Sequence, residues 1–303
     1  MNWVDEHLNP LLYGYVRCIE AEYGSPMNRD ASGTWKYVDG SPVPPDVLER
    51  LKSLPPIPPA YKDIRLSTSG PNKAISTNPN NPKKPQVDHY SKDHTEQAKT
   101  EKHDRVAEYH ADKPSIDRKI AADMKSDHMP TRESAAVLHL INKTAFRLGS
   151  DTDTGAKQQA FGASTLRSDH VEVNGDKVKF GFVGKKGVEQ NKVVQDASLA
   201  KMLNPRIKGA GENGKLFNTT DDKVRAHLDK ITDGKYTPKD MRTWHATSMA
   251  KSEIDKMPKP RNDKEFKAAR KEVAEKVAGH LGNTSTVAIN SYIDPRVWDK
   301  WKQ

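Results

Sequence analysis

Apolar residues recur every three to four positions after Pro130, as they do on one face of a helix. The members of this stripe are Val137, Leu138, Ile141, Ala145 and Leu148. They predict an amphipathic helix that carries Arg147 near its end and stops at Gly149.

The pattern then changes to alternating apolar and polar residues, which predicts a β-hairpin over 170–183. Asn174-Gly175 separates its two strands, and Asn-Gly between alternating segments is the strongest short hairpin signal. A second turn at 184–187 returns the chain into a third strand over 188–194. Lys185 is therefore expected at an exposed hairpin tip.

Capping residues mark the start of two further helices. Thr237, followed by a proline and then Asp240, begins a helix that carries Arg242 in its first or second turn. Asn262 begins another helix, whose apolar stripe ends at Gly282. A turn-like stretch then leads into a short segment that holds a tyrosine near the end of the chain.

The N-terminal part shows weaker periodicity. A helix is predicted over 2–23, although a proline weakens its first turns, and a short one over 46–54 between prolines. Residues 67–85 are rich in Pro, Asn and Gly, which indicates turns between short strands or a mobile loop. Residues 92–127 are charged with few apolar positions, which favours an exposed helix.

These elements predict an α+β protein of two domains. We place a small N-terminal mixed β/α domain at 1–115, with an additional helix possible within 1–30. A mainly α-helical domain with a β-hairpin sheet follows at 116–303. A length of 303 residues is consistent with two domains.

The net charge of +9 lies in the C-terminal part, where residues 131–303 hold 32 basic and 22 acidic side chains. Such asymmetry favours a phosphate-bearing polymer or an acidic membrane as partner, against the alternative of a solvated lysine-rich surface. Asp5 and Glu6 stand where a signal peptide would be basic, and no apolar run is long enough to cross a membrane. We therefore expect an intracellular protein without a membrane partner.

Two familiar kinds of site find little support. The chain has one cysteine, no HExxH motif and no histidines at ligand spacing, so no metal is expected. Residues 209–215 fit GxGxxG by letter, but neither a strand nor a helix start flanks them, which favours a surface turn.

Several cations on well-defined elements and one late tyrosine remain. They lie in FRLGSD, FGASTLRSDHVEV, KFGFVGKKGV, KDMRTWHAT and VAGHLGNTSTVAINSYIDPRV. In these motifs and their order the chain resembles the small type IB DNA topoisomerases of poxviruses and bacteria. The resemblance covers about 131–297 strongly and the N-terminal part, the DNA-clamping domain of that family, more weakly.

The resemblance implies an active site of Arg147, Lys185, Arg242, Asn283 and Tyr292. Tyr292 would be the nucleophile that forms a 3′-phosphotyrosyl bond, Lys185 the general acid, and the other three the groups that stabilise the transition state. Phosphodiester exchange conserves the energy of the bond, so no cofactor, ATP or metal is expected. The implied partner is double-stranded DNA, bound by a monomer in a bacterial cytoplasm, a virion or an infected host cell.

Further DNA contacts are expected, with less support, from Thr165, Arg167, His170 and Lys239. The poxvirus enzymes have His where Asn283 stands here, but an amide NH₂ still donates a hydrogen bond. The alternative enzyme is a tyrosine recombinase, which shares this catalytic domain but usually has His where Lys239 stands. A non-catalytic DNA-binding relative is the other alternative, and the intact tyrosine argues against it.

Overall fold

The computed structural model describes residues 22–68, 73–82, 85–152 and 158–302. The chain divides into two compact units, one up to Glu101 and the other from Lys102 onward. This division falls inside a long helix, about fourteen residues before the boundary expected from the sequence. The helix predicted over 2–23 lies, except for its last two residues, outside the described part of the chain.

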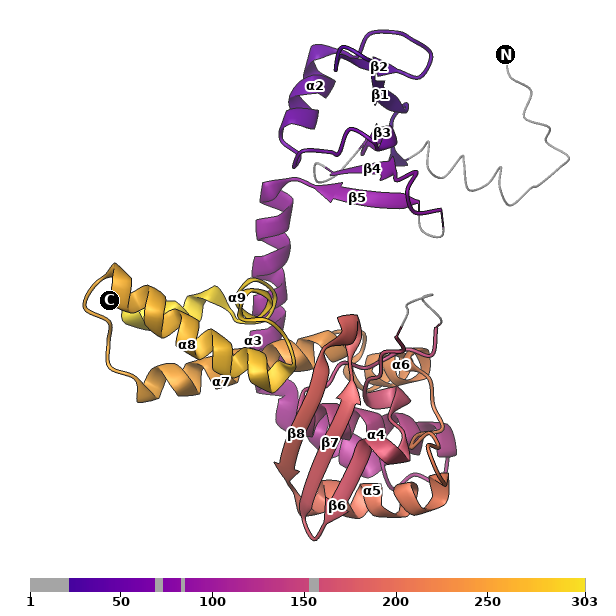
Figure 1. Cartoon of the computed structure of the whole chain (residues 1–303), viewed down its shortest axis with the longest axis vertical. Coiled ribbons are helices and arrows are strands. Elements are labelled where there is room, and N and C mark those ends of the chain that lie inside the picture. Colours follow the sequence, from indigo (N-terminus) through magenta and orange to yellow (C-terminus); the bar gives the residue numbers. More distant parts are fainter. Residues whose placement is uncertain (1–21, 69–72, 83–84, 153–157, 303) are drawn as a thin grey trace, which may run out of the picture. The chain divides into compact units, whose positions relative to one another are not determined.

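The N-terminal unit is built on an antiparallel five-stranded sheet (Figure 1). The strand order is β2-β1-β3-β4-β5, and one short helix, α2, covers Pro45–Lys52, close to the 46–54 predicted between the prolines. The strands are β1 (Met27–Arg29), β2 (Trp35–Tyr37), β3 (Lys62–Leu66), β4 (Lys73–Thr77) and β5 (Gln86–Tyr90). Met27, Leu51 and Ile64 lie in the core of this unit.

Helix α3 (Lys92–Asp123) follows this sheet and is less exposed than the sequence indicated. Tyr109, Ile116 and Ile120 are fully or almost fully buried in the main core of the second unit. The few apolar residues of α3 therefore stabilise that unit, and the prediction that this helix lies outside the core was wrong for its second half.

The second unit combines helices with a three-stranded antiparallel sheet in the order β6-β7-β8. Its strands are β6 (Val171–Asn174), β7 (Lys177–Val183) and β8 (Glu189–Gln195). Its helices after α3 are α4 (Met129–Thr144), α5 (Ala197–Ala210), α6 (Asp221–Thr232), α7 (Pro238–Lys256), α8 (Asp263–Leu281) and α9 (Ser285–Ser291). Short 3₁₀ turns cover Ala163–Thr165, Ser168–His170, Lys185–Gly187 and Pro295–Trp301. The predicted α+β class and the two-turn hairpin sheet are confirmed.

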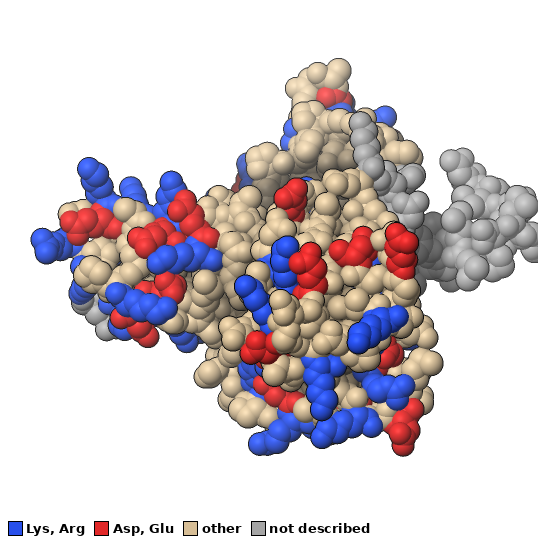
Figure 2. Space-filling view, turned by 60° about the horizontal axis from the view of Figure 1, so that its bottom comes forward, with Lys and Arg blue, Asp and Glu red and all other residues tan. Residues whose placement is uncertain are grey.

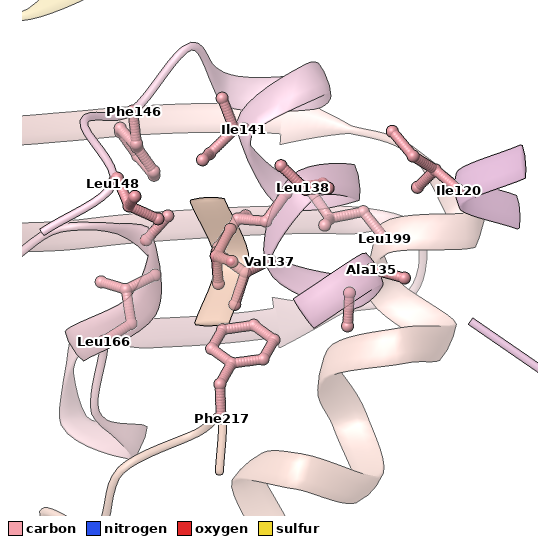
Figure 3. Close-up of a cluster of buried hydrophobic side chains, with 14 of the residues drawn as sticks. Ile120, Ala135, Val137, Leu138, Ile141, Phe146, Leu148, Leu166, Leu199 and Phe217 are labelled. Carbon is pink, nitrogen blue, oxygen red and sulfur yellow. The ribbon is translucent and has the colours of Figure 1, made fainter. Parts of the chain in front are cut away.

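Helix α4 forms the centre of the main core. Val137, Leu138 and Ile141 have no exposed surface, and Figure 3 shows them beside Phe146 and Leu148 from the segment that follows the helix. A second core joins α7, α8 and α9 through residues such as Ala250, Val277 and Ala288.

Charged side chains cover the lobe that holds α7 and α8 on the face shown in Figure 2, with both signs interspersed. Lys276, for example, contacts both Glu253 and Glu272 at 3.0 Å. On this face the lobe therefore carries both signs of charge, whereas the alternative explanation of the basic excess was a solvated lysine-rich surface. No helix in the described ranges combines the length and apolar character that a membrane crossing requires.

Candidate active site

Arg147 lies on an extended segment that begins where α4 ends. The helix stops at Thr144, because Ala145 adopts a left-handed conformation with φ of 56°. The prediction that Arg147 lies within the helix was therefore wrong by three residues. Phe146 and Leu148 on either side are buried in the main core (Figure 3), which leaves Arg147 to face the other way.

A close crossing of two backbone segments fixes this part of the chain. The amide of Ala163 donates to the carbonyl of Arg147 at 2.8 Å, and that of Ser164 donates to the carbonyl of Leu148 at 2.7 Å. Gly162 lies at the crossing, where a Cβ atom would stand 2.7 Å from the Arg147 oxygen. Only a residue without a side chain fits there, so Gly162 helps to determine where Arg147 points.

Tyr292 is presented by the short helix α9, where the sequence predicted a turn-like stretch followed by a short segment of unassigned structure. Thr284 begins this helix by accepting a hydrogen bond from the amide of Val287 at 3.3 Å. Tyr292 follows its last residue, and only 4% of its surface is exposed. The hydroxyl of Thr247 on α7 donates to the carbonyl of Tyr292 at 3.3 Å, which fixes the nucleophile candidate against that helix.

The structure brings Arg147, Asn283 and Tyr292 into direct contact. Nη1 of Arg147 donates to the phenolic oxygen of Tyr292 at 3.1 Å, and Nη2 donates to Oδ1 of Asn283 at 2.6 Å. The amide Nδ2 of Asn283 is buried and has no hydrogen-bond partner among the described residues. Asn283 therefore has a donor left for a further acceptor, such as a phosphate oxygen.

Arg242 also lies against Tyr292. It is 3% exposed, and its guanidinium lies 5.3 Å from the centre of the Tyr292 ring. Its Nη atoms donate to the carbonyls of Ala145 and, at 3.0 Å, Leu281. Burial, together with the charge of Arg147, lowers the pKa of Arg242 to about 10, so the group still carries its charge at neutral pH.

These cations change the acidity of the phenol. Burial alone raises the pKa of Tyr292, but the nearby charges and hydrogen bonds of Arg242 and Arg147 outweigh it and hold the pKa below its usual value. A phenol that ionises more readily is a better nucleophile near neutral pH.

Lys185 lies at the tip between β7 and β8, exposed as predicted. Within the described ranges it makes no hydrogen bond to the other four residues of the implied set. The tip end of the same hairpin lies against this site, because the side-chain amide of Gln190, the second residue of β8, is 2.1 Å from where a Cβ on Gly282 would be. The hairpin therefore approaches Asn283 near its tip, through a residue close to Lys185 in the sequence.

The residues suggested as additional DNA contacts fall in different surroundings. Thr165 is buried and accepts a hydrogen bond from the amide of Gly162 at 2.9 Å. Arg167 lies over the ring of Phe161 at 5.0 Å, and His170 packs on that ring at 4.4 Å. Burial lowers the pKa of His170, which favours its neutral form. Lys239 is exposed in the first turn of α7.

Lys192 on β8 belongs to the surroundings of this site, although it is not among the site residues predicted from the sequence. Its Nζ donates to the carbonyl of His280 at 2.6 Å and to that of Thr144. The alternation of β8 contains the signal that was missed, because Lys192 shares a strand face with the half-buried Val194. Within the described part of the chain, His, Cys, Asp and Glu side chains form no group of three that is suited to a metal.

Comparison with known proteins gives a family match over most of this unit. Residues 91–300 match the family model described as the catalytic core of eukaryotic DNA topoisomerase I. DNA topoisomerase 1B of Acanthamoeba polyphaga mimivirus is 21% identical over 81% of this chain and 77% of its own length. The human mitochondrial DNA topoisomerase I is 31% identical over 42% of this chain, and DNA topoisomerase 1 of Caenorhabditis elegans is 27% identical over 65%. The matched regions span only 22% and 25% of those two longer relatives.

Proposed function

Since the chain belongs to the type IB family of DNA topoisomerases, we propose that it relaxes supercoiled duplex DNA by transient cleavage of one strand. This proposal rests on the hydrogen bond from Arg147 to the hydroxyl of Tyr292. Arg147 also bonds Asn283, and the guanidinium of Arg242 lies over the Tyr292 ring. A buried tyrosine whose hydroxyl accepts a hydrogen bond from one arginine and whose ring lies against a second arginine is suited to attack on a phosphodiester.

The proposed cleavage exchanges one ester bond for another. The phenolic oxygen of Tyr292 loses its proton to water and attacks the phosphorus of the DNA backbone. A bond forms between this oxygen and phosphorus, and the bond from phosphorus to the 5′ oxygen breaks. The enzyme is then joined to the 3′ end, and torsional strain drives rotation of the free 5′ end.

Religation reverses these steps. The 5′ hydroxyl attacks the phosphotyrosine, which restores the DNA strand and releases the phenol. No bond energy is lost in the exchange, so the reaction needs no ATP, and we expect it to proceed without a metal.

Three groups are proposed to stabilise the five-coordinate transition state. Arg147 and Arg242 would donate paired hydrogen bonds to the non-bridging oxygens, since a planar guanidinium matches a phosphate geometrically. Asn283 would add the Nδ2 donor that is unused in the described structure. Removal of one such preorganised donor from an enzyme typically costs about 100- to 1000-fold in rate.

Lys185 is proposed as the general acid that protonates the departing 5′ oxygen. Its exposed position on a hairpin tip allows it to approach DNA, and Gln190 near the same tip already lies against Gly282, next to Asn283. During religation the same lysine would take the proton back.

We further propose that a monomer binds double-stranded DNA mainly through phosphate contacts, so that binding weakens steeply with salt. Relaxation of a supercoiled plasmid in EDTA without ATP tests the proposed function. The parent chain is expected to relax the plasmid, and Tyr292→Phe is expected to leave it supercoiled.

Tyr236→Phe is the matched control, because it also removes a hydroxyl from a buried tyrosine but one that bonds Asp112 at 2.8 Å, outside this set of residues. This control should relax the plasmid like the parent. A requirement for ATP, or relaxation by Tyr292→Phe, would contradict the proposal.

A further inference from the structure

Two cations hold the ends of α4 and α8 together in the same way. Arg242 donates to the carbonyls of Ala145 and Leu281, and Lys192 donates to those of Thr144 and His280, one residue earlier on each helix. The last carbonyls of a helix have no partner within the helix and must find one elsewhere. Here four carbonyls, two at the end of each helix, accept hydrogen bonds from the two side chains.

The carbonyls that accept from these two cations lie shortly before two residues of the proposed active site along the chain. Thr144 precedes Arg147 by three residues, and His280 precedes Asn283 by three. Arg147 and Asn283 themselves meet at 2.6 Å. Lys192 therefore joins the two segments just before Arg147 and Asn283, whose side chains bond each other beside Tyr292.

The surroundings of Lys192 disfavour a charged side chain, because they are buried and hold other cationic or titratable groups. It faces Arg242 and His245 from α7 and His280 from α8, and the ring of Phe146 lies 5.3 Å from its Nζ. Burial lowers the pKa of Lys192 to about 7, with a smaller contribution from the charge of Arg242. A lysine on an exposed position of the same sheet would avoid this cost of desolvation.

We propose that Lys192 is a positioning residue for strand cleavage, which ties the ends of α4 and α8 together so that Arg147 and Asn283 meet at Tyr292. This inference rests on the proposed function. Lys192 acts through the carbonyls of Thr144 and His280, and thereby on the side chains that follow each of them in the sequence. Without Lys192, the donors of Arg147 and Asn283 are displaced. A displacement of about 1 Å at such groups can lower the rate of cleavage by up to about 100-fold.

Single-turnover cleavage by the full chain tests this role, with a DNA duplex whose cleaved strand dissociates and cannot be religated. Lys192→Met keeps the length of the side chain and removes its donors. It is expected to slow formation of the covalent adduct by about 10- to 100-fold and to leave the affinity for DNA unchanged. Lys179→Met is the control, because Lys179 lies on the same sheet but is exposed and paired with Glu172. It is expected to cleave like the parent.

A double-mutant cycle separates positioning from a general loss of structure. If Lys192 acts through Arg147, then Lys192→Met must cost much less in an Arg147→Ala background than in the parent. Equal losses in both backgrounds, or cleavage by Lys192→Met at the parent rate, would overturn the inference while leaving the proposed function intact. A parent chain that forms no adduct would overturn both. If circular dichroism shows that Lys192→Met is unfolded, the same cycle with Lys192→Gln decides the question.

Discussion

Gly162 allows two backbone segments to cross beside Arg147, and Gly162→Ala tests whether that crossing sets the geometry of the site. A Cβ at this position would lie 2.5 Å from the amide nitrogen of Gly149, 2.6 Å from its Cα and 2.7 Å from the carbonyl oxygen of Arg147. All three neighbours are backbone atoms, which cannot turn aside as the end of a side chain can. The backbone of one segment must therefore move.

The size of this movement follows from the distances. Ordinary contact begins at 3.4 Å, so the segments must separate by several tenths of an ångström to almost 1 Å. Overpacking of this kind typically costs about 1–3 kcal/mol of folding stability. A displacement of about 1 Å at a group that positions substrate can lower the rate by about 100-fold. We expect Gly162→Ala to lower stability by that amount and cleavage by about 10- to 100-fold.

Urea unfolding and single-turnover cleavage measure the two effects separately. Gly279→Ala is the control, because Gly279 lies inside α8 and a Cβ added there would meet open space. Alanine there should stabilise the helix by about 0.5–1 kcal/mol and leave cleavage unchanged. If Gly162→Ala matched Gly279→Ala in both assays, the crossing would have no part in placing Arg147.

Three further substitutions test the chemistry of individual groups. Arg147→Ala removes one of the charges that favour the phenolate, so the pKa of Tyr292 should rise. The difference in ultraviolet titration between each chain and its Tyr292→Phe counterpart measures this pKa, and an unchanged value would refute the proposed electrostatic effect. Asn283→His should add a loss of cleavage as pH rises through about 6.5, where imidazole loses its charge, whereas a pH profile identical to that of the parent would contradict the expected role of a neutral donor. Lys185→Ala should cleave slowly on ordinary DNA but at the parent rate on DNA with sulfur at the 5′ leaving position, since that group leaves without a proton. Absence of this rescue would assign the general acid elsewhere.

Local signals predicted most of the second unit well. The Asn174-Gly175 turn, the Thr237 start of α7 and the Asn262 start of α8 all lie where the sequence placed them, because caps and tight turns depend on neighbouring residues. The amide of Glu265 donates to Asn262 at 2.9 Å, and α8 ends at Gly282 in a left-handed conformation.

Features set by tertiary contacts were harder to predict. The apolar stripe continued through Ala145 and Leu148, so nothing in its spacing showed that Ala145 would leave the helix and give its carbonyl to Arg242. Lys192 looked like any strand lysine, since its two acceptors come from helices 48 and 88 residues away in the sequence.

Mass spectrometry of a denatured reaction determines whether the phenol of Tyr292 becomes joined to DNA. Supercoiled DNA is incubated with the full chain, denatured and digested, and the peptide that retains nucleotides is sequenced. The proposed mechanism predicts a nucleotide adduct on Tyr292 at the 3′ end of the broken strand. An adduct on another residue or at a 5′ end, or relaxation that proceeds without any adduct, would contradict it.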